Sequence, residues 1–265
     1  QWITQIYQKF DACLYVGQAN REYFRYHGVG DERLFFSPHA IDNERFMAQA
    51  KTAEPEARLW KQTLGIPKDH RVILFAGKLI PKKRPLDLLQ AFLDANLSKV
   101  SLLFVGAGEL EDNLRQQAQE SGHPHIYFAP FQNQSQMPRA YAAGDVMVLP
   151  SYGSGETWGL AVNEMMCLAR PVIVSSHVGC AEDLVKPEKN GLIFPAGNVD
   201  ALTDCLKSAF GCHRHHLAKW GSYGQKLIQR YSYLHATQGL LDALSANAAF
   251  YSAQTQPKAL AELPS

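Results

Sequence analysis

The sequence predicts an α/β fold in which a Rossmann-like parallel sheet carries helices on both of its faces. One observation behind this prediction is that short apolar runs alternate along the chain with longer amphipathic segments. Another is that most of the Gly-rich and charged motifs directly follow an apolar run, where ligands bind in sheets of this kind. The chain has 265 residues, 46% hydrophobic and 19% charged, which suffices for one large or two modest domains.

The apolar runs and the amphipathic segments give the expected elements in chain order. Strands are predicted at 12–16, 34–37, 72–76, 101–105, 126–129, 146–149, 172–175 and 192–194. Helices are predicted at 85–96, 109–120, 136–143, 159–168 and 199–209, with a further helix between the first two strands. Residues 43–66 are polar and helix-like. The chain opens on Gln1-Trp2-Ile3, without an initiator Met and as if within an amphipathic helix, so we expect it to be part of a longer protein.

Charge, cysteine usage and hydropathy exclude several classes of function. The net charge of +1 provides no basic field for nucleic acid, so no nucleic-acid partner is expected. No run of 18 apolar residues predicts a transmembrane helix, and the start does not resemble a signal peptide. We therefore expect a cytoplasmic protein, with a peripheral position at the inner membrane surface left open. A reducing compartment also suits the five cysteines, which have no CxxC spacing: 13, 167, 180, 205 and 212.

The most informative segment runs from Pro150 to Glu164 and continues to Pro171. An apolar run at 146–149 leads into a Gly-rich stretch, in which Glu156 lies eight positions before Glu164. A strand, a Gly-rich loop and a helix start can hold an anion through backbone N–H groups and the helix dipole. Carboxylates do not bind the anion but accept hydrogen bonds from sugar hydroxyls beside it. The segment therefore predicts a sugar-nucleotide site.

Glu156 and Glu164 resemble the E-x7-E signature of the family 4 retaining glycosyltransferases, which have the GT-B fold. Further segments resemble motifs of the same family, in the same order and at similar spacing, over roughly residues 30 to 205. These segments are Phe75-Ala-Gly-Lys-Leu-Ile-Pro-Lys-Lys83, Leu103-Phe-Val-Gly-Ala-Gly-Glu109, Tyr141-Ala-Ala-Gly-Asp145 with Pro150-Ser151, Val178-Gly-Cys-Ala-Glu182 and Asn190-Gly-Leu-Ile-Phe-Pro195.

The resemblance implies an enzyme of hexosyltransferase type, as used in polysaccharide biosynthesis. Such an enzyme transfers a sugar from a nucleotide diphosphate sugar to a glycan, lipid-linked or small-molecule acceptor, with retention of configuration. In the family's front-face mechanism the leaving phosphate assists the incoming hydroxyl, so neither a protein nucleophile nor a metal or other cofactor is expected. The resemblance assigns 1–42 to a remnant of the acceptor domain, 43–66 to a linker, 67–231 to the donor domain and 232–265 to a crossover helix and tail. Without the missing N-terminal domain, the chain alone should bind donor weakly or not turn over.

The resemblance also assigns roles to individual residues. Lys78 and Lys83 would bind the diphosphate, Glu156 the transferred sugar and Glu164 the ribose hydroxyls. The remaining donor-binding positions are Gly77, Gly106, Gly108, Thr157, Trp158, Gly159 and Leu160. Five positions depart from the usual family residues: Lys78 replaces Arg, Arg84 replaces Gly, Thr157 replaces Gly, Trp158 replaces Phe, and Cys180 after Gly179 replaces a paired Gly.

Other interpretations remain open for several of these residues. Lys78 and Lys83 could form a solvated basic turn, Glu164 an exposed helical residue, and Glu156 a carboxylate favoured only by the helix dipole. An NAD site at Gly106-Ala-Gly108 is disfavoured because Glu111 replaces the third glycine of the fingerprint. We interpret Cys180 as a packing residue rather than a nucleophile. The segment Cys212-His213-Arg214-His215-His216 has metal-like composition, but a polar loop is the simpler interpretation.

Two functions compete with glycosyl transfer. A sugar-nucleotide epimerase has the same fold but would need an acid/base pair at the sugar, which the E-x7-E segment does not favour. A non-catalytic sugar-nucleotide-binding subunit is the other alternative. The presence of Lys83, Glu156 and Glu164 argues against a subunit that has lost its catalytic residues.

Overall fold

The computed structural model describes residues 2–211 and 214–255, which fall into two compact units. The larger unit comprises residues 40–232. The smaller unit joins the residues up to His39 with those from Tyr233 onward. Each unit is described by itself below.

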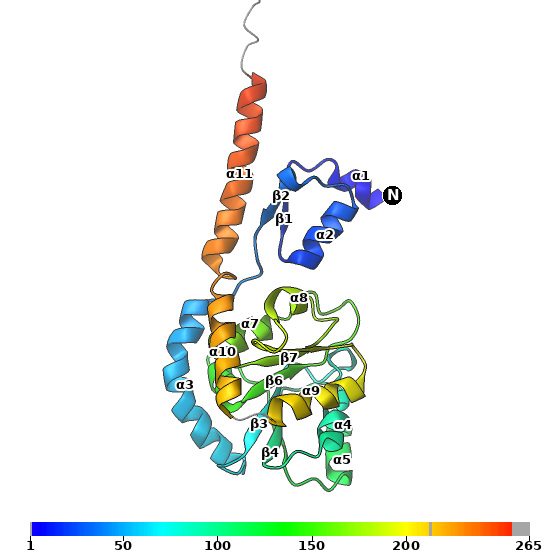
Figure 1. The fold of residues 1–265 in the computed structure, drawn as a ribbon, viewed down its shortest axis with the longest axis vertical. Coiled ribbons are helices and arrows are strands. Elements are labelled where there is room, and N and C mark those ends of the chain that lie inside the picture. The colour runs from blue at the N-terminus through cyan, green and yellow to red at the C-terminus, as the bar shows by residue number, and fades with distance from the viewer. Residues whose placement is uncertain (1, 212–213, 256–265) are drawn as a thin grey trace, which may run out of the picture. The chain divides into compact units, whose positions relative to one another are not determined.

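The larger unit is built on a parallel sheet of six strands, which confirms the predicted fold class (Figure 1). Its spatial order is β5-β4-β3-β6-β7-β8, so the chain moves outward from β3 and then returns to the other side of β3. The point between β3 and β6 is where ligands bind in such folds. The strands are β3 (Arg71–Ala76), β4 (Val100–Val105), β5 (Ile126–Ala129), β6 (Val146–Leu149), β7 (Val172–Ser175) and β8 (Gly191–Phe194).

Helices cover both faces of this sheet, as Figure 1 shows. On one face α4 packs against α9, with α5 beside α4; on the other α3 packs against α6 and α7, and α7 against α10. The four inner strands β4, β3, β6 and β7 are buried on both sides, which explains why they read as nearly continuous apolar runs, whereas the edge strands β5 and β8 are partly buried. The helices are α3 (Asn43–Thr63), α4 (Pro85–Ala95), α5 (Glu111–Glu120), α6 (Met137–Ala143), α7 (Leu160–Cys167), α8 (Ala181–Leu184), α9 (Val199–Gly211) and α10 (Arg214–Ile228).

The predicted helices exist with shifts of one or two residues at their ends. Two-residue shifts occur at the end of α9, which runs to Gly211 rather than 209, and at the start of α5, which begins at Glu111 rather than 109. Before α5, Leu110 donates its N–H to the carbonyl of Leu79 at 2.9 Å. The polar segment 43–66 is largely helix α3, capped by the Asp42 carboxylate, which accepts the N–H of Arg45 at 2.9 Å. Helices α8 and α10 were not predicted.

The smaller unit contains a parallel pair, β1 (Cys13–Tyr15) and β2 (Leu34–Phe36), joined through α2 (Gln18–Tyr26). Helix α11 (Tyr233–Thr255) packs on β2, where a side chain on Gly239 would lie 1.9 Å from the carbonyl oxygen of Phe36. Helix α1 (Trp2–Tyr7) completes the unit.

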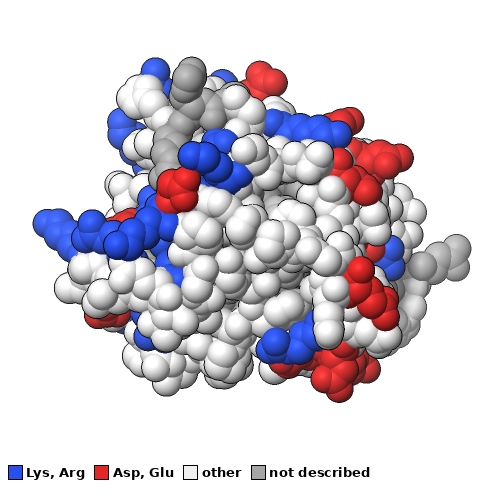
Figure 2. Space-filling view, turned by 90° about the horizontal axis from the view of Figure 1, so that it is seen from below, with Lys and Arg blue, Asp and Glu red and all other residues white. Residues whose placement is uncertain are grey.

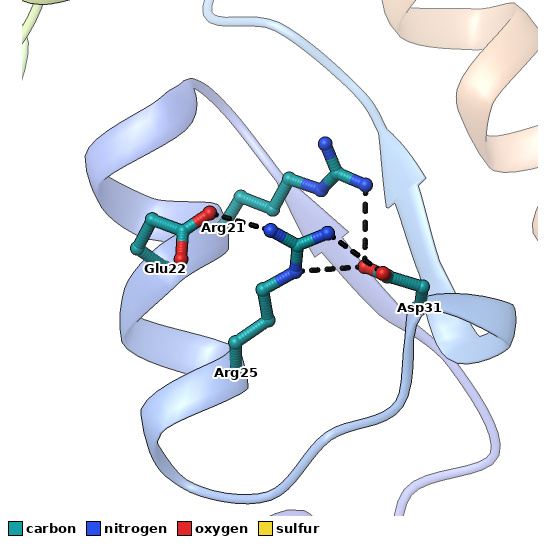
Figure 3. A network of polar contacts seen from close by, with 4 residues as sticks. All are labelled: Arg21, Glu22, Arg25 and Asp31. Carbon is teal, nitrogen blue, oxygen red and sulfur yellow. Dashed lines mark hydrogen bonds and ion pairs between the residues drawn. The ribbon is translucent and has the colours of Figure 1, made fainter.

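An exposed ionic network links α2 to the turn before β2 (Figure 3). Asp31 accepts from Arg21 at 3.2 Å and from Arg25 at 2.6 Å, and Arg25 also contacts Glu22 at 2.7 Å. The bonds from Arg25 hold the pKa of Asp31 below its usual value. Because all four groups are largely exposed, the network orients the turn more than it stabilises the fold.

The charged surface has no dominant sign. Figure 2 shows basic and acidic side chains interspersed around one face, with uncharged surface across its middle, in keeping with the net charge of +1. In the part of the chain that the structure describes, no helix combines the length and the apolarity needed to cross a bilayer.

Three histidines gather near the amino ends of β3 and β5. The rings of His70 and His125 are 4.3 Å apart, and those of His123 and His125 are 5.8 Å apart. Nδ1 of His70 lies 2.9 Å from the hydroxyl of Ser101. Burial, and then the charge of His125, lowers the pKa of both His70 and His123.

We predict that this cluster makes the fold acid-sensitive. The folded pKa values lie below those of the unfolded chain, so the unfolded chain binds more protons and stability rises with pH. The free energy of unfolding should therefore fall as pH drops from 7.5 to 5.5, through the unfolded value of about 6.5. The double variant His70→Gln/His123→Gln should lose less stability over this range, measured by denaturant unfolding at each pH. His215→Gln, at an exposed position, is the control; parallel curves for wild type and double variant would contradict the prediction.

Candidate functional site

A cavity of about 710 Å³ opens at the carboxyl ends of β3 and β4. It is lined by residues of the loops after β3, β4 and β5 and of the helices α6 and α7. The lining residues are Ala76, Gly77, Lys78, Ile80, Lys82, Lys83, Val105, Gly106, Ala107, Gly108, Phe131, Gln132, Gln134, Met137, Tyr141, Ala161 and Glu164.

Two glycines allow the first two loops to touch backbone to backbone. A Cβ on Gly106 would lie 1.9 Å from the carbonyl oxygen of Gly77, and one on Gly108 would lie 2.3 Å from that of Leu79. Leu79 in turn donates its N–H to the carbonyl of Ala107 at 2.9 Å. Any side chain at either glycine would push the loops apart and change the wall of the cavity.

Lysines enter the cavity from the loop after β3, which ends in the 3-10 turn Pro81–Lys83. Lys78, Lys82 and Lys83 all line it, and Lys82 also donates to the carbonyl of Gly155 at 3.2 Å. The next residue, Arg84, has φ +51°, in the left-handed region. This backbone conformation explains why glycine suits the position, where Arg84 is the departure noted in the sequence.

Glu156 meets Lys83 at the edge of this cavity but is not among its lining residues. The two form an ion pair with side chains only 12% and 17% exposed, and the hydroxyl of Ser151 donates to the same carboxylate oxygen at 3.0 Å. The loop of Glu156 is held in place by Gly179, which donates its N–H to the Glu156 carbonyl at 2.9 Å. A Cβ on Gly179 would lie 2.0 Å from the carbonyl oxygen of Thr157, which explains the glycine there.

Glu164 projects from α7 into the cavity and is 9% exposed. Its Oε2 accepts the hydroxyl of Tyr141 at 2.5 Å. Burial raises the pKa of the Glu164 carboxyl, while hydrogen bonds from Tyr141 and Gln134 and the charge of Arg45 oppose this rise. Burial and the Glu164 charge raise the pKa of Tyr141 well above its usual value, so the phenol is the proton donor of this pair.

Of the residues between the two glutamates, Ala161 lines the cavity and the others do not. The Trp158 side chain is 4% exposed; its Nε1 donates to Oδ1 of Asn163 at 3.0 Å, and its ring packs against Tyr231. Gly159, with φ +99°, begins α7 in a conformation that favours glycine. Thr157 and Leu160 are exposed.

The structure therefore brings only some of the sequence-predicted residues together. Gly77, Lys78, Lys83, Gly106, Gly108 and Glu164 surround one cavity, and Glu156 joins them through Lys83. Thr157, Trp158, Gly159 and Leu160 lie outside the cavity wall.

The part of the cavity wall formed by the chain after β5 was not predicted from the sequence. Phe131, Gln132, Gln134 and Met137 line the cavity, although no motif pointed to them. Their place after a predicted strand was an available signal, since ligands bind at the carboxyl ends of strands. Tyr141 belonged to a recognised motif but had no role assigned.

Several other motif residues hold the scaffold. The carboxylate of Asp145 accepts the N–H of Val72 at 2.7 Å, which anchors the start of β3. The Asn190 amide bridges Lys186 N–H and the Leu184 carbonyl at 2.7 and 2.8 Å. Cys180 is fully buried, and burial raises the pKa of its thiol far above the usual value, as suits a packing residue.

Cys212 and His213, from the segment of metal-like composition, lie outside the described residues. Over residues 2–211 and 214–255, no three His, Cys, Asp or Glu side chains are placed to hold a metal ion.

Comparison with known proteins identifies relatives of this arrangement. The family model "Glycosyl transferases group 1" matches residues 56–227. The D-inositol 3-phosphate glycosyltransferase of Saccharomonospora viridis is 30% identical over 214 residues, covering 76% of this chain and 47% of the relative. The uncharacterized glycosyltransferase MJ1607 of Methanocaldococcus jannaschii is 31% identical over 166 residues, covering 61% and 40%. The chain thus spans less than half the length of these two curated relatives.

Among solved structures, the Anabaena protein Alr3699/HepE in complex with UDP matches with a TM-score of 0.76 and 21% identity, over 89% of this chain and 64% of that one. The same protein in complex with UDP-glucose matches with a TM-score of 0.71. These likenesses establish the fold, and the family model covers well over half of the chain. The chain therefore belongs to the group 1 glycosyltransferases, the family 4 proteins of GT-B fold that its motifs resemble.

Proposed function

We propose that this chain carries the donor site of a retaining glycosyltransferase, which transfers a hexose from a nucleoside diphosphate sugar to an acceptor. The observation that carries the proposal is that lysines and a buried glutamate line one cavity at the carboxyl edge of the sheet. Cations suit a diphosphate and a carboxylate suits a ribose diol, so the cavity offers a partner to both parts of a nucleoside diphosphate.

In this proposal the donor lies across the loops. The diphosphate binds Lys78 and Lys83, the ribose binds Glu164, and the base lies toward Phe131 and Gln134. The amide of Gln132 is already engaged, because it accepts from Arg139 at 2.6 Å and donates to the Pro130 carbonyl at 2.9 Å. The Gln134 amide is engaged as well, with Arg45 and Glu164. The wall after β5 therefore offers the exposed aromatic ring of Phe131 to a base.

The chemistry follows from where charge develops. Breaking the bond between the sugar C1 and the phosphate oxygen leaves new negative charge on the terminal phosphate. Lys78 and Lys83 stabilise that charge more in the transition state than in the ground state. The acceptor oxygen bonds to C1 on the same face, and its proton passes to the leaving phosphate oxygen.

A uridine nucleotide sugar is the first donor to test, because a protein of this fold has been solved with UDP and with UDP-glucose. We assign residues 40–232 to donor binding. The smaller unit corresponds to part of the acceptor domain. Release of UDP with transfer of the sugar to an acceptor would indicate glycosyl transfer, whereas conversion of the sugar nucleotide to its epimer without net release of UDP would indicate epimerisation.

The first test concerns Lys83. Lys83→Ala should weaken UDP binding to this chain, because a hydrogen bond to a charged group contributes about 1.5–3 kcal/mol. This corresponds to roughly tenfold to a little over a hundredfold in Kd, measured by titration calorimetry. Lys99→Ala is the matched control, since Lys99 is 70% exposed and pairs with Asp69 away from the cavity. Equal affinities of wild type and Lys83→Ala would contradict the assignment.

The second test separates the two glutamates. Glu164→Gln should weaken UDP and UDP-glucose by similar factors, because both ligands contain the ribose. Glu156→Gln should weaken UDP-glucose more than UDP, because its partner in the proposal is the transferred sugar. Calorimetric titration of both ligands into both variants measures the two ratios. If Glu164→Gln left UDP affinity unchanged while weakening UDP-glucose, the two roles would have to be exchanged.

A further inference from the structure

A buried phenol is aimed at the glutamate of the donor cavity. Tyr141, in the middle of α6, is 2% exposed and yet lines the cavity. Its hydroxyl reaches across 23 residues of sequence to Oε2 of Glu164 at 2.5 Å. Both side chains are largely buried, so this hydrogen bond satisfies polar groups that have little access to bulk water.

Packing fixes the direction of the phenol. The ring of Tyr141 lies 6.4 Å from that of Phe46 on α3, and Phe46 is fully buried. Helix α3 packs against α6, and this packing confines the buried ring of Tyr141. The hydroxyl thereby points to the Glu164 carboxylate.

The surroundings of Glu164 make the hydrogen bond from the Tyr141 hydroxyl important. Burial favours the neutral carboxyl, which could accept fewer hydrogen bonds from a diol than the carboxylate can. The opposing groups come from separate elements: Tyr141 on α6, Gln134 on the loop after β5, and Arg45 on α3, whose Nη2 donates to Oε1 of Gln134 at 3.3 Å. Cys167, one turn further along α7, has its pKa raised to about 12 by burial and contributes no charge near neutral pH.

We propose that Tyr141 is a positioning residue of the donor site: its hydroxyl occupies one oxygen of Glu164 and turns the other toward the ribose hydroxyls of the nucleotide. The inference rests on the proposed function, because it gives Glu164 the ribose as its ligand. The new element is that Glu164 needs the Tyr141 hydroxyl in order to bind the ribose well. Without the phenol, the buried carboxylate loses a donor and its ionised form is disfavoured.

Tyr141→Phe removes the hydroxyl and keeps the ring. UDP affinity near pH 7 should fall roughly tenfold, as expected for one hydrogen bond to a charged group. The acid limb of the pH profile of UDP binding should also move to higher pH, because Glu164 takes up a proton more easily. Titration of the UDP phosphate is common to all variants, so the ratio of variant to wild-type affinity at each pH isolates this effect.

Two comparisons distinguish a positioning role of Tyr141 from a general effect of the substitution on the structure: a double-mutant cycle with Glu164, and a change of ligand. In a Glu164→Gln background, Tyr141→Phe should have little further effect on UDP affinity. With 2′-deoxyuridine diphosphate as the probe, Tyr141→Phe should cost less than it does with UDP. Tyr127→Phe is the matched control, because its hydroxyl contacts only the carbonyl of Gly65 at 3.2 Å, outside the cavity. It should leave both affinity and pH profile unchanged.

If Tyr141→Phe does not fold, 3-fluorotyrosine at position 141 keeps the ring and hydroxyl as a stronger donor, and the acid limb should move to lower pH. The inference is overturned if wild type binds UDP but neither change at position 141 moves the pH profile. It is also overturned if Tyr141→Phe costs the same with Glu164 and with Gln at position 164. Failure of wild type to bind UDP, GDP or ADP would instead remove the proposed function, and this inference with it.

Discussion

Strand β3 has unequal neighbours, and the location of the site depends on this. It pairs with β4 along all of its residues, from Arg71 to Ala76, but with β6 only at Ile73 and Leu74. Close pairing on one side brings the loops after β3 and β4 together until only Gly106 and Gly108 fit between them. On the other side the ladder to β6 stops at Leu74, and the loops after β3 and β6 meet further out. There Tyr152 donates its N–H to the Lys82 carbonyl at 2.8 Å, and Lys83 pairs with Glu156. The cavity is lined by the loops after β3, β4 and β5 together with α6 and α7.

Much of the fold was predictable because strand and helix periods are local properties. The strands of the larger unit were placed to within one residue, since each is a continuous apolar run bounded by polar residues. Helix α10 escaped because Trp220 and Ile228 are spread among polar residues. A pattern of that kind shows which residues are apolar, but not whether a buried surface is available to them.

The site was less predictable, for a reason that Trp158 illustrates. The motif placed this residue between two site glutamates, but its side chain points into the core, against Tyr231. Sequence position fixes where a backbone goes, whereas packing decides which way a side chain turns. Tyr141 is the opposite case: it was seen only as part of a motif, and its contact with Glu164 depends on α3, α6 and α7 packing together.

The ion pair between Lys83 and Glu156 has a consequence for how a donor would enter. Lys83 already has an anionic partner within the protein, so an arriving diphosphate has to compete with the Glu156 carboxylate for the same cation. On the proposed function, binding is then an exchange of anions: the phosphate takes the lysine, and the released carboxylate becomes an acceptor for the hydroxyls of the sugar. A nucleotide without a sugar would trigger the same release and leave Glu156 with only Ser151 as its partner. The complete sugar nucleotide would give both groups of the broken ion pair a new partner: its phosphate would bind Lys83, and its sugar hydroxyls would bind Glu156.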